Sequence, residues 1–255
     1  MTLGLTRDGS GPPLVLLHGL GAHRGVWNPV IPFLRGEREV FAFDLPGFGD
    51  SPPLAGPATP ARLAESITSE LDRLGVESAA VAGNSLGGWV AMEMALAGKA
   101  ENATAIAPAG LWRAPLVAKP TIGQKFAKAF YPLMPALTRL DFLRRGLLTT
   151  QTAFPARIPR EDVLMLLQRY AKAKGLKSAN DAMRAAHFTR LADITVPVTL
   201  VWCERDRLIA RPRQLPGQVH EAILYNCGHL PMWDDPAAVA AAILAGARTA
   251  EPARA

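Results

Sequence analysis

Short apolar runs alternate with helix-like segments along the first 110 residues of this chain. The runs cover residues 14–17, 39–43, 78–82 and 102–107, with a weaker one at 2–6. Residues 59–74 begin with Thr-Pro and then repeat apolar side chains at helical spacing. Trp27, Val30 and Phe33 are spaced for a further helix face and are expected to be core. Buried strands that alternate with amphipathic helices predict an α/β fold with a parallel sheet.

The alternation stops after Gly110, and only helical patterns occur until about residue 190. They cover 122–131, 137–148 and 161–173, and prolines at 115, 120, 132, 135, 155 and 159 separate them. Strand patterns return at 198–202 and 221–225, and a last helix starts at Asp235-Pro236. We therefore predict an α/β core from residues 1–110 and 191–255, with an α-helical cap inserted as residues 111–190. The core is expected to hold a mostly parallel, twisted sheet of about seven strands with helices on both faces.

The composition is that of a globular protein with one large core. The chain has 255 residues, 49% of them hydrophobic. It contains no run of 18 apolar residues, and its start lacks the basic and apolar regions of a secretion signal. We therefore expect a cytoplasmic protein without a membrane span. Cys203 and Cys227 have no metal-binding spacing and are expected to be buried free thiols. The oligomeric state is left open.

The net charge of +6 comes from the helical segment. Residues 111–190 hold 15 Lys or Arg against 4 Asp or Glu, whereas the rest of the chain has more acids than bases. This excess could attract an acidic substrate such as a carboxylate-bearing acyl group or a coenzyme A thioester, or it could be a solvated surface, which we favour. No basic groove with interleaved aromatic residues accompanies the charge, so nucleic-acid binding is not expected.

A Gly-x-Ser-x-Gly pattern stands where the apolar run 78–82 passes into a helix-like segment, at Gly83-Asn-Ser85-Leu-Gly87. A serine at such a turn takes strained backbone angles, which are tolerated only if Gly83 and Gly87 lack side chains. The N–H of Leu86 begins the helix and is positioned to bind an oxyanion. Because an ordinary glycine-rich turn can have the same pattern, other residues must decide whether Ser85 is a nucleophile.

Two polar residues follow strands later in the chain and complete a catalytic set. Asp206 comes after the strand at 198–202 and His229 after the last strand. With Ser85 they would leave the same carboxyl edge of a parallel sheet, in the order Ser, Asp, His. A serine needs a base to remove its proton, and a histidine base needs a carboxylate to orient it. Asp206 could instead be a surface turn residue, or Glu204 could replace it, but the position after the strand favours Asp206.

Other polar residues are expected to have structural roles. His18-Gly-Leu-Gly21 follows the first long apolar run, and the N–H of Leu20 is our candidate for a second oxyanion donor. His18 could be a base, but a brace for this loop is the favoured interpretation. Asp44, Asp50 and Ser51 are expected to bond within their own loop. No residues have metal-ligand spacing, so we expect no metal and no cofactor.

Together these segments resemble the α/β-hydrolase family over almost the whole chain. The matching segments are His18-Gly-Leu-Gly21, Asp44-Leu-Pro-Gly-Phe-Gly-Asp-Ser51, Gly83-Asn-Ser-Leu-Gly-Gly88, Glu204-Arg-Asp206 and Cys227-Gly-His229. The resemblance implies Ser85 as nucleophile, His229 as general base and then acid, Asp206 as its carboxylate, and Leu20 and Leu86 as oxyanion-hole amides. It also implies that residues 111–190 are the family's cap domain. Because few residues precede the first core strand, the family's antiparallel edge strand is expected to be missing or very short.

The resemblance also narrows the reaction. Ser85 stands where haloalkane dehalogenases and epoxide hydrolases of this fold carry aspartate, so neither reaction is expected. Hydrolysis of a carboxylic ester or thioester through an acyl-enzyme is the leading hypothesis. The Gly-Asn-Ser-Leu-Gly-Gly elbow is also similar to that of hydrolases that cleave carbon–carbon bonds in ring-fission products, although those have a more glycine-rich oxyanion loop. A ligand-binding receptor with vestigial catalysis is a third interpretation.

Substrate selectivity is expected to come from the cap. Aromatic side chains there could line an apolar pocket for a small to medium apolar substrate, or could simply form the core of the cap. The candidates are Trp112, Phe126, Phe130, Phe142, Phe154 and Phe188, with Met232 and Trp233 near the base.

Overall fold

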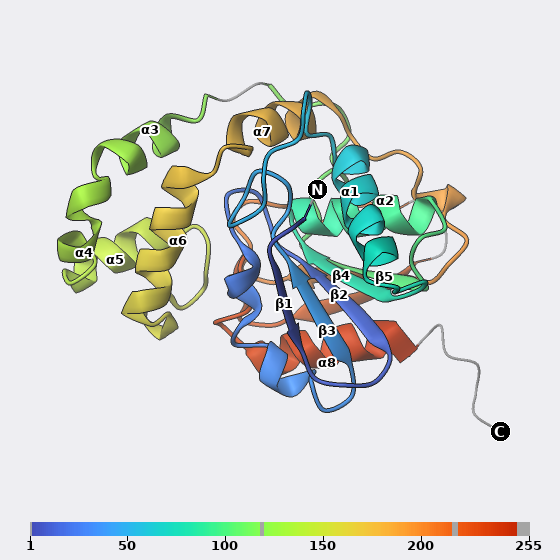
Figure 1. The fold of residues 1–255 in the computed structure, drawn as a ribbon. Coiled ribbons are helices and arrows are strands. Elements are labelled where there is room, and N and C mark those ends of the chain that lie inside the picture. The colour runs from blue at the N-terminus through green and yellow to red at the C-terminus, as the bar shows by residue number, and fades with distance from the viewer. Residues whose placement is uncertain (1, 118–119, 216–218, 249–255) are drawn as a thin grey trace.

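The computed structural model of the chain describes residues 2–117, 120–215 and 219–248. Within these ranges, seven strands form one sheet in the order β1-β3-β2-β4-β5-β6-β7 (Figure 1). The strands are β1 Leu5–Asp8, β2 Pro13–Leu17, β3 Glu39–Phe43, β4 Ala80–Asn84, β5 Asn102–Ile106, β6 Val198–Cys203 and β7 His220–Leu224. β1 runs antiparallel to β3, and the other neighbouring strands are parallel. The predicted fold class is confirmed.

The antiparallel edge strand is present but has only four residues. Leu5 pairs with Phe43 and Asp8 with Val40. The strand begins later than the run at residues 2–6 suggested, because Gly4 bonds to a loop of the core. Its N–H donates to Ser51 Oγ at 2.9 Å and its carbonyl accepts the N–H of Asp44 at 2.8 Å. The edge of the sheet is therefore short rather than absent.

Alternate residues of each central strand enter two different hydrophobic layers. Val15 and Leu17 pack in the layer that contains α1 (Pro60–Arg73) and α2 (Leu86–Leu96). Leu14 and Leu16 pack in the layer that contains α8 (Pro236–Arg248). Figure 1 shows α1 and α2 on one side of the sheet and α8 on the other. Because both faces are covered, β2 is apolar at every position rather than at every second one.

The expected helix around Trp27 is replaced by two short 3-10 turns, η1 Arg24–Trp27 and η2 Ile31–Phe33. Trp27 and Val30 are fully buried, but Phe33 is 51% exposed, so its assignment to the core is wrong. A proline at the start of η2 begins a new turn. The helical phase that the spacing assumed is therefore not kept across both turns.

Between β5 and β6 the described residues form helices and no strands. These are α3 Ile122–Ala129, η3 Tyr131–Leu133, α4 Met134–Leu137, α5 Asp141–Leu148, η4 Pro155–Arg157, α6 Arg160–Lys172, α7 Leu176–Ala185 and η5 Leu191–Asp193. The sequence did not predict α7, because its buried face contains small residues such as Ala179 beside Leu176 and Met183. We use "the insert" for residues 111–190, and its status as a separate cap domain stays a prediction.

The insert extends to one side of the sheet, as Figure 1 shows for α3 to α6, whereas α7 lies against the core. Ser178 of α7 accepts the N–H of Ala58 at 2.9 Å, and Leu176 and Met183 join the layer of α1 and α2. An ion pair between Arg169 of α6 and Asp50 joins the insert to the loop that follows β3. The insert and the sheet are therefore held together by apolar and polar contacts.

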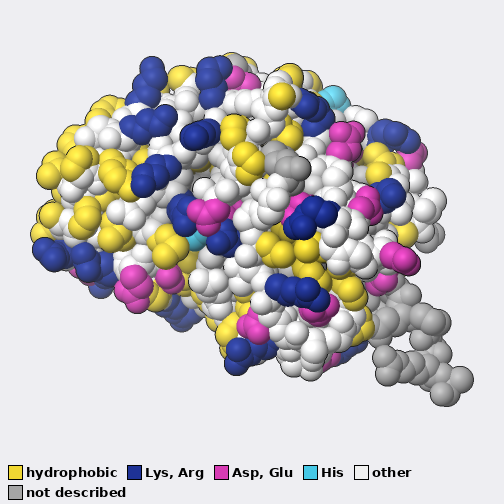
Figure 2. All heavy atoms as spheres, in the orientation of Figure 1, with side chains coloured by type: hydrophobic (Ala, Val, Ile, Leu, Met, Phe, Trp, Pro, Cys, Tyr) yellow, Lys and Arg dark blue, Asp and Glu magenta, His cyan; other side chains and the backbone are white. Residues whose placement is uncertain are grey.

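Exposed apolar side chains cover much of the outer face of the insert (Figure 2). The large apolar side chains of the insert that are exposed include Ile122, Phe126, Phe130, Leu133, Leu140, Phe142 and Leu147. In Figure 2, Lys and Arg side chains lie among the apolar side chains of this face. No helix of the described residues is long and apolar enough to cross a membrane.

Candidate active site

Ser85 occupies a strained turn between β4 and α2. Its backbone angles are φ 57° and ψ −116°, in a region that residues with side chains rarely adopt. A Cβ added to Gly83 would lie 2.1 Å from the carbonyl oxygen of Gly87. A Cβ added to Gly87 would lie 2.2 Å from the carbonyl oxygen of Leu17. Both glycines are required by close backbone contacts, which hold Ser85 at the carboxyl end of the sheet.

The loop that follows β2 lies directly beside this turn. Gly21 has φ 78°, and the N–H of Ala22 donates to the carbonyl of Gly19 at 3.2 Å, so the loop is a tight turn with a glycine at its third position. A Cβ on Gly19 would lie 3.1 Å from Ser85 Cβ. β2 and β4 are neighbours, but the chain continues from β2 to β3 on one side and from β4 to β5 on the other. Open α/β sheets bind ligands at the carboxyl ends of two strands whose connections diverge in this way.

His229 and Asp206 form a hydrogen-bonded couple at the ends of β7 and β6. His229 Nδ1 lies 2.8 Å from Asp206 Oδ2, and both side chains are almost entirely buried. Asp206 Oδ1 accepts the backbone N–H groups of Leu208 and Ile209 at 2.7 and 2.9 Å. Because the carboxylate accepts at Nδ1, the other ring nitrogen of His229, Nε2, remains for proton transfer. Glu204 does not compete, since its Oε2 accepts the N–H of Asn226 at an exposed site.

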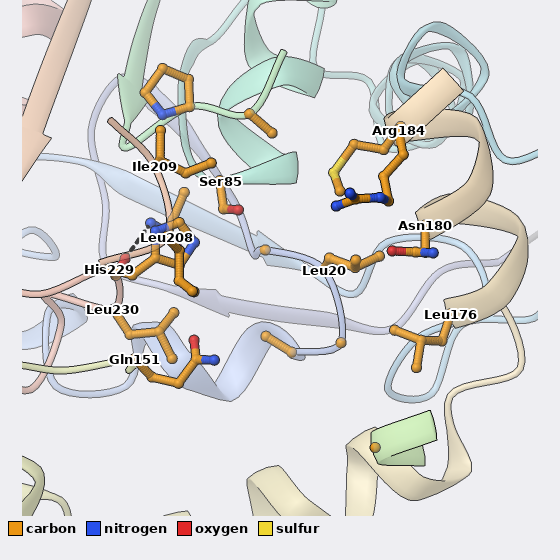
Figure 3. A pocket seen from close by; sticks show the side chains of 18 of the residues that line it. Leu20, Ser85, Gln151, Leu176, Asn180, Arg184, Leu208, Ile209, His229 and Leu230 are labelled. Atoms are coloured by element: carbon orange, nitrogen blue, oxygen red, sulfur yellow. Dashed lines mark hydrogen bonds between the residues drawn. The ribbon is translucent and has the colours of Figure 1, made fainter. Parts of the chain in front are cut away.

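Ser85 and His229 line a single cavity of about 1500 Å³ between the sheet and the insert (Figure 3). Leu20 lines it as well, next to Ser85. Leu86 is the first residue of α2, and its N–H therefore has no acceptor within the helix. The structure thus brings Ser85, His229 and the loop of Leu20 to one cavity.

Only part of the predicted aromatic pocket lies at this cavity. Trp112, Phe126, Phe130 and Phe188 line it, whereas Phe142, Phe154, Met232 and Trp233 do not. Phe142 is 71% exposed on α5, and the ring of Phe154 packs under the guanidinium groups of Arg157 and Arg205. Met232 is fully buried in the layer of α8. Aliphatic residues take their place, among them Leu147, Leu148, Leu166, Leu167, Leu208, Ile209 and Leu230.

His18 is a buried brace. Its Nε2 accepts the N–H of Leu45 at 3.0 Å, so its Nδ1 carries the proton that is donated to the carbonyl of Gly19 at 2.8 Å. Burial lowers the pKa of His18 below its ordinary value, which keeps the ring neutral. Both nitrogens are occupied, and His18 fixes the loop of Gly19 to the loop that follows β3.

The polar residues of the 44–51 loop bond partly within that loop, as expected. Ser51 Oγ donates to the carbonyl of Asp44 at 2.6 Å, and the N–H of Asp50 donates to Asp44 Oδ2 at 2.9 Å. Both carboxylates also pair with Arg24, and Asp50 pairs with Arg169 of the insert. Hydrogen bonds from Arg169 and Arg24 lower the pKa of Asp50. The sequence indicated the bonds within the loop, but not the ion pairs that join the loop to Arg24 and to the insert.

Two buried polar residues near the site were missed at the level of sequence. Asn84 Nδ2 donates to the carbonyl of His229 at 2.9 Å, which connects the residue before Ser85 to the loop of the base. Asp234 Oδ2 accepts the N–H of Gly228 at 2.8 Å, while its two oxygens accept the N–H groups of Ala153 and Phe154. Asn84 stands inside the Gly-x-Ser-x-Gly pattern, but no pattern marks Asp234.

The described residues contain no group of three or more His, Cys, Asp or Glu side chains placed to hold a metal ion. Cys203 and Cys227 are free and buried, as expected. Burial raises the pKa of both thiols, that of Cys227 to about 12. Neither thiol is therefore a ready nucleophile at neutral pH.

Comparison with known proteins places the chain among hydrolases. A model described as the alpha/beta hydrolase family matches residues 14–242. Epoxide hydrolase EphH of Mycobacterium tuberculosis is 29% identical over 188 residues, 68% of this chain and 88% of that protein. The 2-hydroxy-6-oxononadienedioate/2-hydroxy-6-oxononatrienedioate hydrolase 2 of Pseudomonas putida is 27% identical over 237 residues, 87% of this chain and 82% of that protein.

Two esterases are also similar. The pimeloyl-acyl-carrier-protein methyl ester esterase of Aeromonas hydrophila is 43% identical over 98 residues, but these make up only 38% of this chain and 37% of the esterase. The structure of a thermophilic esterase from Thermogutta terrifontis superposes with a TM-score of 0.74 at 21% identity, over 98% of this chain and 94% of that one. At this identity the superposition shows the shared fold.

Proposed function

Because the chain belongs to the alpha/beta hydrolase family, we propose that it is a serine hydrolase that cleaves a carboxylic ester, or thioester, through an acyl-enzyme intermediate. The observation that carries the proposal is that His229, whose Nδ1 lies 2.8 Å from Asp206 Oδ2, lines the same cavity as Ser85. The substrate is a small to medium molecule with a largely apolar body, in keeping with the leucines and aromatic residues of the cavity.

In the first half of the reaction, Ser85 Oγ attacks the carbonyl carbon of the ester while His229 Nε2 takes its proton. Asp206 holds the Nδ1 proton and stabilises the imidazolium that forms. The N–H groups of Leu20 and Leu86 donate to the oxyanion, and their backbone position means that no reorganisation is needed during the attack. His229 then gives the proton to the leaving alcohol or thiol, which leaves the acyl group on Ser85.

In the second half, a water molecule replaces the alcohol as the partner of His229. His229 removes a proton from the water as its oxygen attacks the acyl carbon. When the tetrahedral intermediate collapses, His229 returns the proton to Ser85 Oγ, which releases the acid and restores both residues. The same oxyanion donors serve both halves. No metal or cofactor takes part in these steps.

The serine itself favours this chemistry over that of the epoxide hydrolase relative. The resemblance to the family implies that epoxide hydrolases of this fold carry aspartate where this chain has Ser85, and a serine hydroxyl has no carboxylate to offer. A methyl ester esterase is also among the similar proteins. We therefore rank ester hydrolysis first.

The proposal is tested by turnover of short p-nitrophenyl esters by the wild type and Ser85→Ala. Ester hydrolysis that falls to the uncatalysed rate in Ser85→Ala supports it, provided that the variant unfolds at the same temperature as the wild type. Hydrolysis that survives the substitution would remove Ser85 as the nucleophile.

Carbon–carbon bond hydrolysis is the second candidate. The Gly83-Asn-Ser-Leu-Gly-Gly88 elbow resembles that of hydrolases with this activity, and the Pseudomonas putida 2-hydroxy-6-oxononadienedioate hydrolase aligns over 87% of the chain. Rapid turnover of a dienoate ring-fission product, with negligible activity on esters, would reverse the ranking. A receptor with vestigial catalysis predicts instead that neither substrate is turned over, although ligands still bind in the cavity.

A further inference from the structure

The cavity of Ser85 and His229 has a one-sided charge. Five of the described residues that line it are arginines and none is an acid: Arg113, Arg144, Arg184, Arg211 and Arg213. Arg144 and Arg211 are paired with Asp141 and Glu221, which do not line the cavity. A largely apolar cavity with arginines and without carboxylates has a positive potential, because low-dielectric walls focus the field of its charges.

Arg184 differs from the other four in its position and its partners. It lies on α7 and is half-buried, whereas Arg113, Arg211 and Arg213 are exposed. Its Nε donates to the carbonyl of Val117 at 2.7 Å. Its two terminal nitrogens have no hydrogen bond or ion pair with the described residues.

Figure 3 shows that the Arg184 side chain extends from α7 into the cavity, on the side opposite His229. Ser85 and Leu20 lie between them. Because the Nε–H is held by a backbone carbonyl, the direction of the guanidinium is fixed and its unpaired nitrogens face the cavity. A substrate with its carbonyl at Ser85 would therefore have one end near Arg184.

A purely structural role accounts for part of this arrangement. Arg184 is in the last turn of α7, where a cation interacts favourably with the helix dipole. The dipole does not require the guanidinium to point into the cavity, and a solvated arginine would extend outward. A structural role therefore does not explain why the Arg184 guanidinium points into the cavity, or why its two terminal nitrogens have no partner among the described residues.

We propose that Arg184 binds a carboxylate of the substrate, so that the enzyme acts on esters whose remote end is anionic, such as half-esters of dicarboxylic acids. That the substrate is an ester rests on the proposed function, whereas the binding of a carboxylate by Arg184 does not depend on it. The planar guanidinium can give a carboxylate two parallel hydrogen bonds, which a lysine cannot.

The test compares monomethyl esters of dicarboxylic acids, from succinate to sebacate, with the dimethyl esters of the same acids. The wild type should have a higher kcat/KM for the monomethyl ester, with a maximum at one chain length. Arg184→Gln should lower kcat/KM for that ester by about tenfold to a hundredfold, mainly through KM, since charged hydrogen bonds of this kind are lost. Its activity on the dimethyl ester should stay within a factor of about two, which also shows that the variant is folded.

Two further variants sharpen the test. Arg184→Lys keeps the charge but loses the bidentate geometry, so its kcat/KM for the monomethyl ester should lie between those of the wild type and Arg184→Gln. Arg213→Gln removes an exposed arginine of the same lining and should change the preference little. A preference for dimethyl esters at every length, or equal losses on both esters in Arg184→Gln, would overturn the proposal.

Binding separates the anion site from the reaction. If the wild type hydrolyses neither ester, the proposed function fails, and calorimetric titration with the dicarboxylates themselves then tests Arg184. Binding that is at least tenfold weaker in Arg184→Gln than in the wild type supports the site. Equal binding, or no binding to either protein, contradicts it.

Discussion

His229 Nδ1 lies 2.8 Å from Asp206 Oδ2, while the other oxygen of the same carboxylate accepts the N–H groups of Leu208 and Ile209. The two backbone donors prevent the carboxylate from rotating, so the imidazole is held in one orientation. Nearly complete burial of both side chains strengthens this pairing, because water does not compete for it. The couple therefore has the geometry that a base beside Ser85 requires.

Replacing Asp206 by Asn should reduce kcat by about 10³- to 10⁴-fold while the protein stays folded. The amide has the size of the carboxylate, but it can stabilise the wrong tautomer of His229 and carries no charge. Steady-state kinetics on a p-nitrophenyl ester measure the loss. Glu204→Gln is the matched control, because the Glu204 carboxylate accepts the backbone N–H of Asn226 at an exposed site, and the substitution should leave kcat within a factor of about two.

The glycines of the elbow should tolerate no side chain. Gly87→Ala would place a Cβ 2.2 Å from the carbonyl oxygen of Leu17, so the strand and the helix must move apart. We expect a loss of about 3 kcal/mol or more in the free energy of unfolding, measured by urea denaturation. Gly36→Ala provides the control: its Cβ would meet no atom within 4 Å, and its stability should change by less than about 1 kcal/mol. Equal losses in the two variants would disprove the steric argument.

The sequence predicted those parts of the fold and site that depend on local patterns. The strands at β2, β3 and β6 begin within a residue of the expected positions, because they are continuous apolar runs between turns. The Ser85 turn is marked by Gly83 and Gly87, whose close contacts make them irreplaceable. These features are encoded by neighbouring residues.

Features that depend on distant contacts were not predictable. Asp234 binds N–H groups from Gly228 and from the insert, and nothing in its own neighbourhood indicates those partners. Phe126 of α3 lines the cavity and Phe142 of α5 does not, although both are aromatic residues of short helices in the insert. Which face of a helix meets the cavity is decided by how the short helices of the insert pack, and the prolines between them break the helical phase.

Asp234 should contribute strongly to stability. Asp234→Ala leaves three backbone N–H groups without their acceptor, at a residue that is 3% exposed. We expect a loss of about 3 kcal/mol or more, seen as a lower urea midpoint. The neighbouring Asp235→Ala removes only an exposed N-cap of α8, which accepts the N–H of Ala238, and should cost about 1 kcal/mol. Similar costs for both substitutions would contradict the role assigned to Asp234.

Stability should decrease in mildly acidic solution because of buried histidines. Burial lowers the pKa of His23 from 6.5 to about 4, so the unfolded chain binds a proton between these values while the folded protein does not. The contribution is present above pH 6.5 and is lost as the pH falls toward 4, by about 2 kcal/mol at pH 5. His18, whose pKa is also lowered by burial, adds to the effect in the same direction.

Urea denaturation at pH 7.5 and pH 5 checks this prediction. His23→Asn keeps an acceptor for the N–H of Gly25 but does not titrate, so the difference between the two pH values should shrink. An unchanged difference in this variant would show that other groups cause the acid sensitivity.

The central claim is that Ser85 is a nucleophile activated by His229. It is tested most directly by reaction with a fluorophosphonate, followed by mass spectrometry of the intact protein and of its peptides. We expect one adduct, on the peptide that contains Ser85, with no adduct in Ser85→Ala and much slower labelling in His229→Ala. Failure of the wild type to react, or an adduct on a residue other than Ser85, would contradict the account.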